Sequence, residues 1–153
     1  EQQWFKGKSY RGFCPVGPYI YLLDEDEFPY LNQLELHLQI NGETRQRVIT
    51  DQLLYKPTET LTEMSEIFNL KTGELVLTGT PGGVCLRLNP EIINHIYDNT
   101  ISHQDKINYF VETQQNNGYL KSGDIMHLEI KSTDGSIDLG VQENKIIQAA
   151  AVK

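Results

Sequence analysis

The chain has 153 residues, 39% of them hydrophobic and 22% charged, which suits one domain with its own core and excludes a disordered or fibrous protein. Thirteen basic residues against twenty-one acidic ones give a net charge of −8, so a nucleic-acid partner is not expected. No apolar run approaches the ~20 residues that span a bilayer, so no membrane association is expected.

The two cysteines, Cys14 and Cys85, lie too far apart in the sequence to form a CxxC redox or zinc motif. The N-terminus does not read as a signal peptide, and it lacks an initiator methionine, which hints that residues upstream are missing. With no disulfide framework, a reducing cytoplasmic compartment is predicted.

The first half of the chain predicts mainly strands. Residues 18–23 form a short apolar run typical of a strand, and residues 34–40 alternate apolar and polar side chains with a period of two. Asn41-Gly42 follows at once, which is the strongest short hairpin signal. The return strand is predicted over residues 44–50.

A helix and a further strand are predicted next. Thr60 and Glu63 have capping-box spacing, and the apolar side chains that follow have helical spacing, so a helix is predicted over about 58–69. Residues 74–78 then predict a strand that leads into the glycine-rich turn 78–83.

Residues 89–117 form a polar segment of different character. Asn89-Pro90 fits a helix N-cap followed by proline at the first helical position, and two short helices are predicted. This helical insertion is expected to cover a sheet edge or the mouth of a site.

The last part of the chain predicts a second hairpin. Residues 126–130 and 137–141 alternate, and Asp134-Gly135 supplies the turn between them. The fold class expected is therefore mostly β with short helices (α+β), in one domain covering residues 1–153.

The spacing of the glycines excludes two nucleotide-binding motifs. Gly7-Lys8-Ser9 would need a glycine five positions before Gly7 to form a phosphate loop, and Gln2 stands there. The turn 79–83 has its glycines at the wrong spacing for a dinucleotide fingerprint.

Four segments, in this order and spacing, resemble the fumarylacetoacetate hydrolase superfamily, in the C-terminal portion of its catalytic domain. They span nearly the whole chain and comprise residues 7–18, 41–46, 72–84 and 139–144. The resemblance implies a mixed β-sheet roll or sandwich and an enzyme that is usually dimeric. The substrates it implies are small diketo acids and 2-oxo acids, transformed through enol or enolate intermediates.

The resemblance also implies a divalent metal ion, commonly Mg²⁺ or Mn²⁺ and sometimes Ca²⁺, held by a Glu-x-Glu pair and an Asp. In the family these acids precede the Gly-Lys-Ser segment, and the chain starts only seven residues before Lys8. The metal ligands are therefore expected upstream of Glu1, with none in this chain, and so are the residues that activate water. Two alternatives follow: part of a longer enzyme, or a shortened and inactive relative.

Lys8 matches the family lysine that lies beside the metal and the substrate oxygens. An ammonium group there would stabilise the charge that develops on an enolate or oxyanion, so Lys8 is the predicted catalytic residue. A solvated surface lysine is the alternative.

Thr80 matches the second threonine of the family's Thr-Gly-Thr-Pro turn. Its hydroxyl and the nearby backbone N–H groups, including that of Gly79, are predicted to bind a substrate carboxylate, because glycines let the backbone approach closely. A plain tight turn is the alternative, and it is the interpretation given to Gly82 and Gly83.

The remaining candidates favour structural roles. The acidic run 24–27 lacks the alternation of a calcium loop and is predicted to be a solvated turn. Cys14 is expected to be buried as a small hydrophobe, and Ser9 has no triad partner. None of the four histidines pairs with a Cys or carboxylate at metal-ligand spacing; they are His37, His95, His103 and His127.

The function predicted from the resemblance is a divalent-metal-dependent hydrolase that cleaves a C–C bond in an acylpyruvate-like acid, acting as a homodimer. One alternative is a hydratase, isomerase or oxaloacetate decarboxylase on the same fold. Another is a catalytically silent lobe for dimerisation or ligand sensing. Residues 89–117 are expected to shape the mouth of the site.

Overall fold

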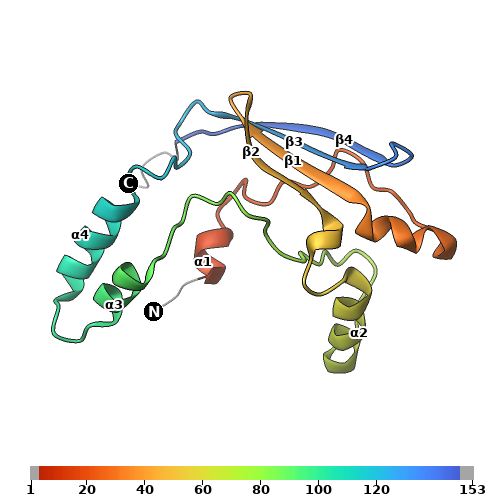
Figure 1. Cartoon of the computed structure of the whole chain (residues 1–153). Helices are drawn as coiled ribbons and strands as arrows, with labels where there is room; N and C mark the ends of the chain where they lie inside the picture. Colours follow the sequence, from red (N-terminus) through yellow and green to blue (C-terminus); the bar gives the residue numbers. More distant parts are fainter. Residues whose placement is uncertain (1–3, 149–153) are drawn as a thin grey trace.

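A computed structural model describes residues 4–148 of the chain. Its centre is one four-stranded antiparallel sheet with the order β2-β1-β3-β4, and the helices lie on one side of it or beyond its ends (Figure 1). The strands are β1 (Leu34–Ile40), β2 (Glu43–Ile49), β3 (Ile125–Ser132) and β4 (Asp138–Lys145). The α+β class expected from the sequence is confirmed.

Both predicted hairpins are present. Asn41 and Gly42 have φ angles of 52° and 83°, the left-handed conformation that a two-residue hairpin turn requires. The Asn41 side chain also donates to the Asp124 carboxylate at 2.9 Å and accepts from the Ile125 N–H at 2.9 Å. The first turn is thereby tied to the start of β3, which places β3 beside β1.

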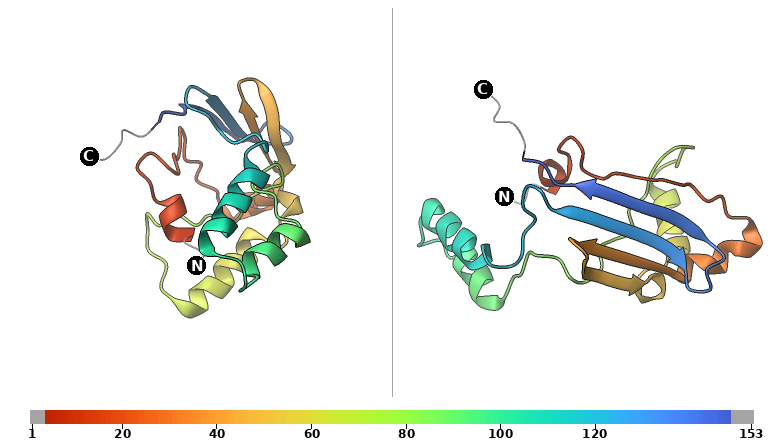
Figure 2. Two further views of the ribbon diagram at one scale, coloured as in Figure 1. Left: turned by 90° about the vertical axis from the view of Figure 1, so that its left-hand side faces the viewer. Right: turned by 90° about the horizontal axis from the view of Figure 1, so that it is seen from above.

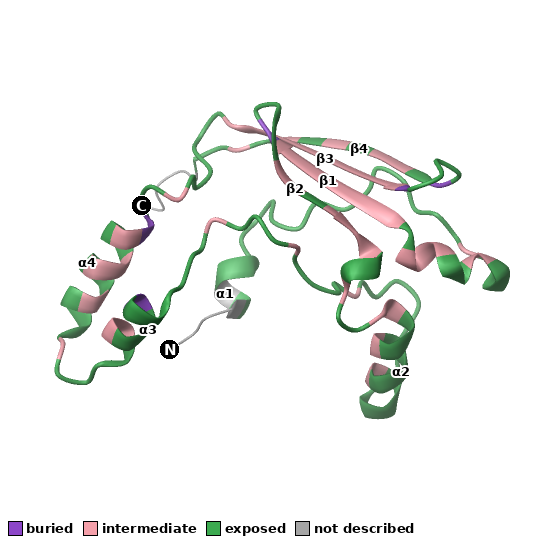
Figure 3. Cartoon of the chain, in the orientation of Figure 1, coloured by how far each residue is buried: buried purple, intermediate pink, exposed green. Residues whose placement is uncertain are grey.

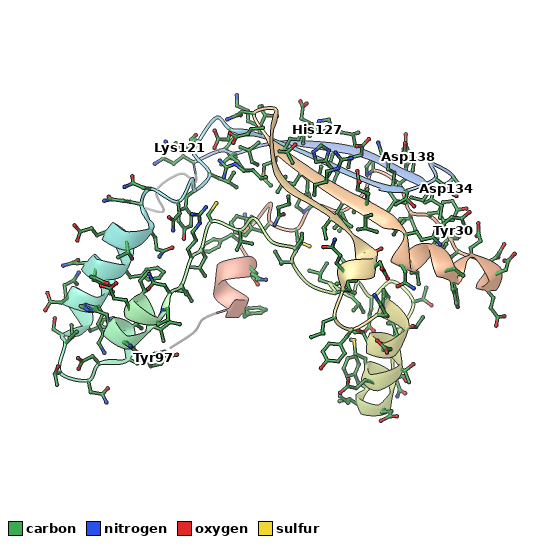
Figure 4. All side chains as sticks on the ribbon, viewed as in Figure 1. Tyr30, Tyr97, Lys121, His127, Asp134 and Asp138 are labelled. Atoms are coloured by element: carbon green, nitrogen blue, oxygen red, sulfur yellow. The ribbon has the colours of Figure 1, made fainter. Side chains whose placement is uncertain are left out.

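The second hairpin turns through Asp134, whose carboxylate collects several hydrogen bonds. It accepts from the Ser132 hydroxyl at 2.6 Å, from the Ser136 N–H and hydroxyl at 3.0 and 2.7 Å, and from the Tyr30 hydroxyl at 3.3 Å. Figure 4 shows Tyr30 and Asp134 together at the end of the sheet, with His127 further along it. The turn is thus joined to the segment that precedes β1.

These hydrogen bonds predict acid sensitivity. The Ser132 hydroxyl, followed by the backbone and hydroxyl of Ser136, holds the pKa of Asp134 well below its usual range. A lowered pKa contributes stability that is present above the unfolded value of about 4 and is lost as the pH falls below it.

Between about pH 5 and pH 2, the free energy of unfolding should fall more steeply in the unmodified chain than in Asp134→Asn. Urea titrations at several pH values would measure this, and Asp26→Asn, at an exposed carboxylate, is the control. Parallel slopes for all three proteins would contradict it.

Helix α2 (Pro57–Ile67) agrees with the predicted helix, but its cap lies a turn earlier than expected. The Glu59 carboxylate accepts from the Lys56 N–H at 2.8 Å, while the Thr60 N–H already donates to the Lys56 carbonyl at 3.0 Å. Thr60 is therefore inside the helix, and the capping box predicted from it is wrong. Pro57 fixes the start, because proline is favoured in the first turn.

The insertion contains the two predicted helices, α3 (Pro90–Tyr97) and α4 (His103–Gln114). The Asn89 side chain accepts from the Ile92 N–H at 2.8 Å, as the predicted cap requires. The helices contact each other and lie beyond one end of the sheet (Figure 1 and the right-hand view of Figure 2). They do not cover a sheet edge, so that expectation is wrong, and a role at the mouth of a site stays a prediction.

Two predicted strands are wrong. Residues 18–23 and 74–78 have the side-chain pattern of strands, but neither is paired with another strand in the described part of the chain. Side-chain alternation reports the two faces of a segment and cannot supply the neighbouring backbone that a strand needs. Three short helices had not been predicted: α1 (Trp4–Lys8), η1 (Glu25–Asn32) and η2 (Thr50–Gln52).

The buried core is small. Among the described residues only Ile40, Ile92 and Ile137 are buried hydrophobic side chains, and the apolar positions of β1 and β3 are mostly half-buried (Figure 3). The chain exposes 12,517 Å², whereas a compact protein of this mass exposes about 7,900 Å². The chain therefore presents much more apolar surface than a compact monomer. No helix in residues 4–148 is long and apolar enough to cross a membrane.

Candidate functional site

A β-bulge in β2 shapes the first part of the candidate site. Leu38 pairs with Gln46 and the next residue of β1, Gln39, pairs with Thr44, so Arg45 has no residue opposite it. A bulge of this kind re-aims side chains and increases the local twist. The Arg45 guanidinium donates to the Gly118 carbonyl at 3.2 Å, which ties β2 to the chain that returns from α4.

The glycine-rich turn is seated on this bulged strand. The Gln46 side-chain amide donates to the carbonyls of Pro81 and Gly82, at 3.0 and 3.1 Å. Gly83 has φ +97°, and a Cβ added there would lie 2.2 Å from the Arg45 carbonyl oxygen. A hydrogen-atom side chain is therefore required for the turn to lie this close to β2.

The N-terminal segment is seated in the same way on the other edge strand, β4. The Gln142 amide donates to the Pro15 carbonyl at 3.5 Å and to the Gly17 carbonyl. A Cβ on Gly140, which has φ +74°, would lie 2.8 Å from the Pro18 and Tyr19 side chains. Figure 2 shows this segment running alongside β4.

Two of the predicted site residues lie in the glycine-rich turn, and the third lies in α1, which precedes the segment held on β4. Lys8 is exposed at the end of α1, and Thr80 and Gly79 are exposed in the glycine-rich turn. The space around Gly79 is open, since a Cβ there would meet no atom within 4 Å. A ligand can therefore approach this backbone, as binding of a carboxylate requires. The segments are held on opposite edge strands of the sheet, and the roles of the three residues stay predictions.

Two cavities in the described part of the chain lie elsewhere. One of about 550 Å³ is between α3 and α4, where the His95 ring stacks on Tyr109 with ring centroids 3.8 Å apart. The other, of about 200 Å³, lies between residues 19–23 and the sheet and is mostly apolar. Neither is lined by Lys8, Gly79 or Thr80.

Residues 4–148 contain no group of three or more His, Cys, Asp or Glu side chains placed to hold a metal ion. His37, for example, has its Nε2 atom 2.9 Å from the Thr44 hydroxyl. The donor set present in this part of the chain therefore does not fit the divalent ion that the family resemblance implies.

The acidic run 24–27 has a structural role. The Glu27 carboxylate accepts from the Asp24 N–H at 3.0 Å and from the Tyr21 hydroxyl at 2.8 Å, which closes the first turn of η1. The backbone hydrogen bond first, and the hydroxyl second, lower the pKa of Glu27. The hydrogen bond to Glu27 in turn raises the pKa of Tyr21.

Both cysteines are free thiols. Cys14 is exposed, with φ 58°, so the expectation that it is buried is wrong. It lies in the turn that follows α1, where the described residues leave its side chain at the surface. The Cys85 thiol donates to the Gly118 carbonyl at 3.2 Å.

Gln46 and Gln142 are functional candidates that the sequence analysis missed. Both lie inside segments that carried the family resemblance, 41–46 and 139–144, and this was the signal available. Their partners are 35 to 127 residues away along the chain. No local pattern therefore indicates what they bind.

The geometry defines an α+β protein whose edge strands each hold one motif-bearing loop. The family model for the fumarylacetoacetate (FAA) hydrolase C-terminal domain matches residues 1–147. The chain belongs to the fumarylacetoacetate hydrolase family.

Several relatives are similar over nearly the whole chain. A 2,4-didehydro-3-deoxy-L-rhamnonate hydrolase of Sphingomonas sp. is 31% identical over 94% of this chain and 39% of the relative. A mitochondrial oxaloacetate tautomerase of Bos taurus is 30% identical over 95% of this chain and 36% of the relative. The solved fumarylacetoacetate hydrolase from psychrophilic Exiguobacterium antarcticum matches with a TM-score of 0.64 and 25% identity, over 94% of this chain and 39% of that one. The chain thus spans about two fifths of the length of these proteins.

Proposed function

We propose that this chain forms part of the catalytic domain of a hydrolase, which cleaves the C–C bond of a small diketo acid or 2-oxo acid of the acylpyruvate type. The observation that carries the proposal is the seating of both motif-bearing loops on the sheet. One loop presents Thr80 and Gly79 to solvent, and the other follows the helix that ends in Lys8. The hydrolase among the relatives supports the same class of reaction.

The proposed chemistry assigns one task to each group. The Thr80 hydroxyl and the open backbone at Gly79 bind the substrate carboxylate, because donors converge where glycine leaves room. Water adds to the distal carbonyl, the C–C bond breaks, and the bonding electrons pass to the pyruvate enolate, which then takes up a proton. The Lys8 ammonium stabilises this enolate as its charge develops.

A divalent metal ion belongs to the proposal through the family resemblance, and it would polarise the oxo-acid oxygens. The described residues offer no ligand set for it. Its ligands are therefore assigned to polypeptide outside residues 4–148, and the groups that activate water are assigned there through the family resemblance.

A tautomerase is the second candidate, because oxaloacetate tautomerases are among the relatives. Tautomerisation also passes through an enolate, so it needs the same carboxylate and enolate sites but no attacking water. Measuring pyruvate release from an acylpyruvate separates the two, since a tautomerase changes only the keto–enol ratio. A hydratase or decarboxylase, and a silent lobe for dimerisation or ligand sensing, complete the alternatives on this fold.

A homodimer in the cytoplasm is also part of the proposal. The exposed apolar surface supports an additional interface, because burial of apolar area drives association.

The anion site can be tested by titrating the ¹⁵N-labelled chain with pyruvate. We expect the amide signals of residues 79, 80, 82 and 83 to shift, and Lys8→Ala and Thr80→Val each to weaken binding about tenfold, the usual effect of losing a hydrogen bond to a charged group. Lys71→Ala and Thr72→Val, two exposed positions, are the matched controls. Unchanged amide signals in the unmodified chain, or equal affinity in all variants, would contradict the assignment.

A further inference from the structure

We propose that Gln46 and Gln142 are positioning residues that fix the two motif-bearing loops on opposite edges of the sheet. The inference rests on the proposed function for the roles of Thr80 and Lys8. The placement of the loops themselves rests on contacts that are independent of any reaction.

Gln46 holds the loop of Thr80 by two hydrogen bonds. Its half-buried side-chain amide has two N–H hydrogens, and the two acceptors are the consecutive carbonyls of Pro81 and Gly82. The first of these carbonyls belongs to the residue directly after Thr80. Two bonds from one planar amide fix the orientation of the Pro81–Gly82 backbone as well as its distance from β2.

Steric contact fixes the depth of the same loop. Gly83 lies against the Arg45 carbonyl with no room for a side chain, and Arg45 is the bulged residue beside Gln46. The loop is thus in contact with β2 at Gly83 and hydrogen-bonded to it at Pro81 and Gly82. The attachment to β2 therefore fixes the position of Thr80, which lies at its exposed side.

Gln142 repeats the arrangement on β4. Its amide donates to the carbonyls of Pro15 and Gly17, and Gly140 lies against Pro18 and Tyr19. Each edge strand therefore contributes one glutamine that donates and has one glycine at the place of closest approach. The glycine belongs to the loop on β2, where it is Gly83, and to the strand itself on β4, where it is Gly140.

The segment held by Gln142 is connected to Lys8 by short-range contacts. The Ser9 hydroxyl donates to the Phe5 carbonyl at 2.6 Å, at the end of α1. The Phe13 N–H then donates to the Tyr10 carbonyl at 3.0 Å, and the rings of these two residues lie 5.6 Å apart. These contacts lie between α1 and the part of the loop fixed on β4, and they connect the two locally.

Replacing either glutamine by glutamate tests whether its amide acts as a hydrogen-bond donor. Glutamate has nearly the same shape as glutamine, but a carboxylate accepts where the amide donates. In Gln46→Glu at neutral pH, a negative charge would face two carbonyl oxygens and repel the loop. A protonated glutamate at acidic pH recovers one donor, so the defect should diminish as the pH falls. A residue that only fills space would show no such recovery.

The experiment compares ¹⁵N spectra of the unmodified chain, Gln46→Glu and Gln142→Glu, first without ligand at pH 7. We expect Gln46→Glu to move the amide signals of residues 79, 80, 82 and 83 and to leave those of residues 12–14, 16 and 17 in place. Gln142→Glu should do the reverse. Signals that move in both segments for either variant would indicate general destabilisation and would overturn the proposal.

The second readout is pyruvate affinity relative to the unmodified chain at each pH. For Gln46→Glu we expect binding about tenfold weaker at pH 7, with the difference from the unmodified chain becoming smaller near pH 4, where most glutamate side chains are protonated. A ratio independent of pH would overturn the positioning role. If pyruvate binds none of the proteins, the carboxylate site of the proposed function fails, while the ligand-free spectra still decide how the loops are held.

Discussion

Gly83→Ala is expected to lower the free energy of unfolding by about 3 kcal/mol and to displace the glycine-rich turn from β2. Two costs combine, because φ +97° is a conformation that side chains rarely adopt and the added Cβ would lie 2.2 Å from the Arg45 carbonyl oxygen. Each of them is worth about 1–3 kcal/mol. The atom in the way is backbone, so no rotation of a side chain relieves the contact. Urea denaturation followed by circular dichroism would measure the loss.

The neighbouring residue supplies a matched control for this substitution. A Cβ on Gly82 would meet no atom within 4 Å, so Gly82→Ala should change the free energy of unfolding by about 0.5 kcal/mol or less. Both variants add one methyl group to the same turn, but only Gly83 combines a positive φ with a close backbone contact. Equal losses in the two would mean that the close approach of Gly83 to β2 does not hold in solution.

Gln114→Ala is expected to lower the free energy of unfolding by about 3 kcal/mol. This side chain is 4% exposed, and its amide donates to the Arg87 carbonyl at 2.8 Å and accepts from the Arg87 N–H at 3.1 Å. It pairs with Arg87 as a neighbouring strand would, and it also accepts from Asn117 at 2.9 Å. Each buried group left without a partner costs about 1–3 kcal/mol.

The same substitution should loosen one region in particular. Hydrogen exchange of backbone amides in α3, α4 and residues 85–88 should accelerate more than exchange in β1 and β3. Gln115→Ala, at the exposed next position, is the control and should leave the exchange pattern unchanged. Gln114→Glu replaces the donor with a buried carboxylate that faces the Arg87 carbonyl, so its loss at neutral pH should be at least as large. Uniform acceleration over all elements would refute the local role of Gln114.

The hairpins could be predicted from the sequence because their determinants are local. Asn41-Gly42 requires only its own left-handed backbone, and the alternation in residues 34–40 distinguishes two faces whatever lies nearby. The cap at Asn89 was local as well, since its side chain reaches only three residues ahead. Such elements are specified within a few residues of chain.

Residues 18–23 and 74–78 show where local patterns fail. Their side chains have strand character, but strand formation depends on a neighbouring backbone that may come from any part of a polypeptide. The candidate site has the same difficulty. Lys8 and Thr80 were found through a family resemblance, whereas Gln46 and Gln142 required knowledge of contacts between distant segments.

The segment that contains α3 and α4 begins and ends at neighbouring points in the structure. Cys85 and Gly118 are joined by a hydrogen bond, and so are Arg87 and Gln114. Because its two ends are in contact, the segment forms a closed loop. The entropy cost of closing such a loop depends only weakly on its length. The number of residues between Arg87 and Gln114 can therefore change with little disturbance to the sheet, provided that these closing contacts remain. The length and sequence of this segment can therefore vary within the family while the edge strands keep their contacts with the two loops.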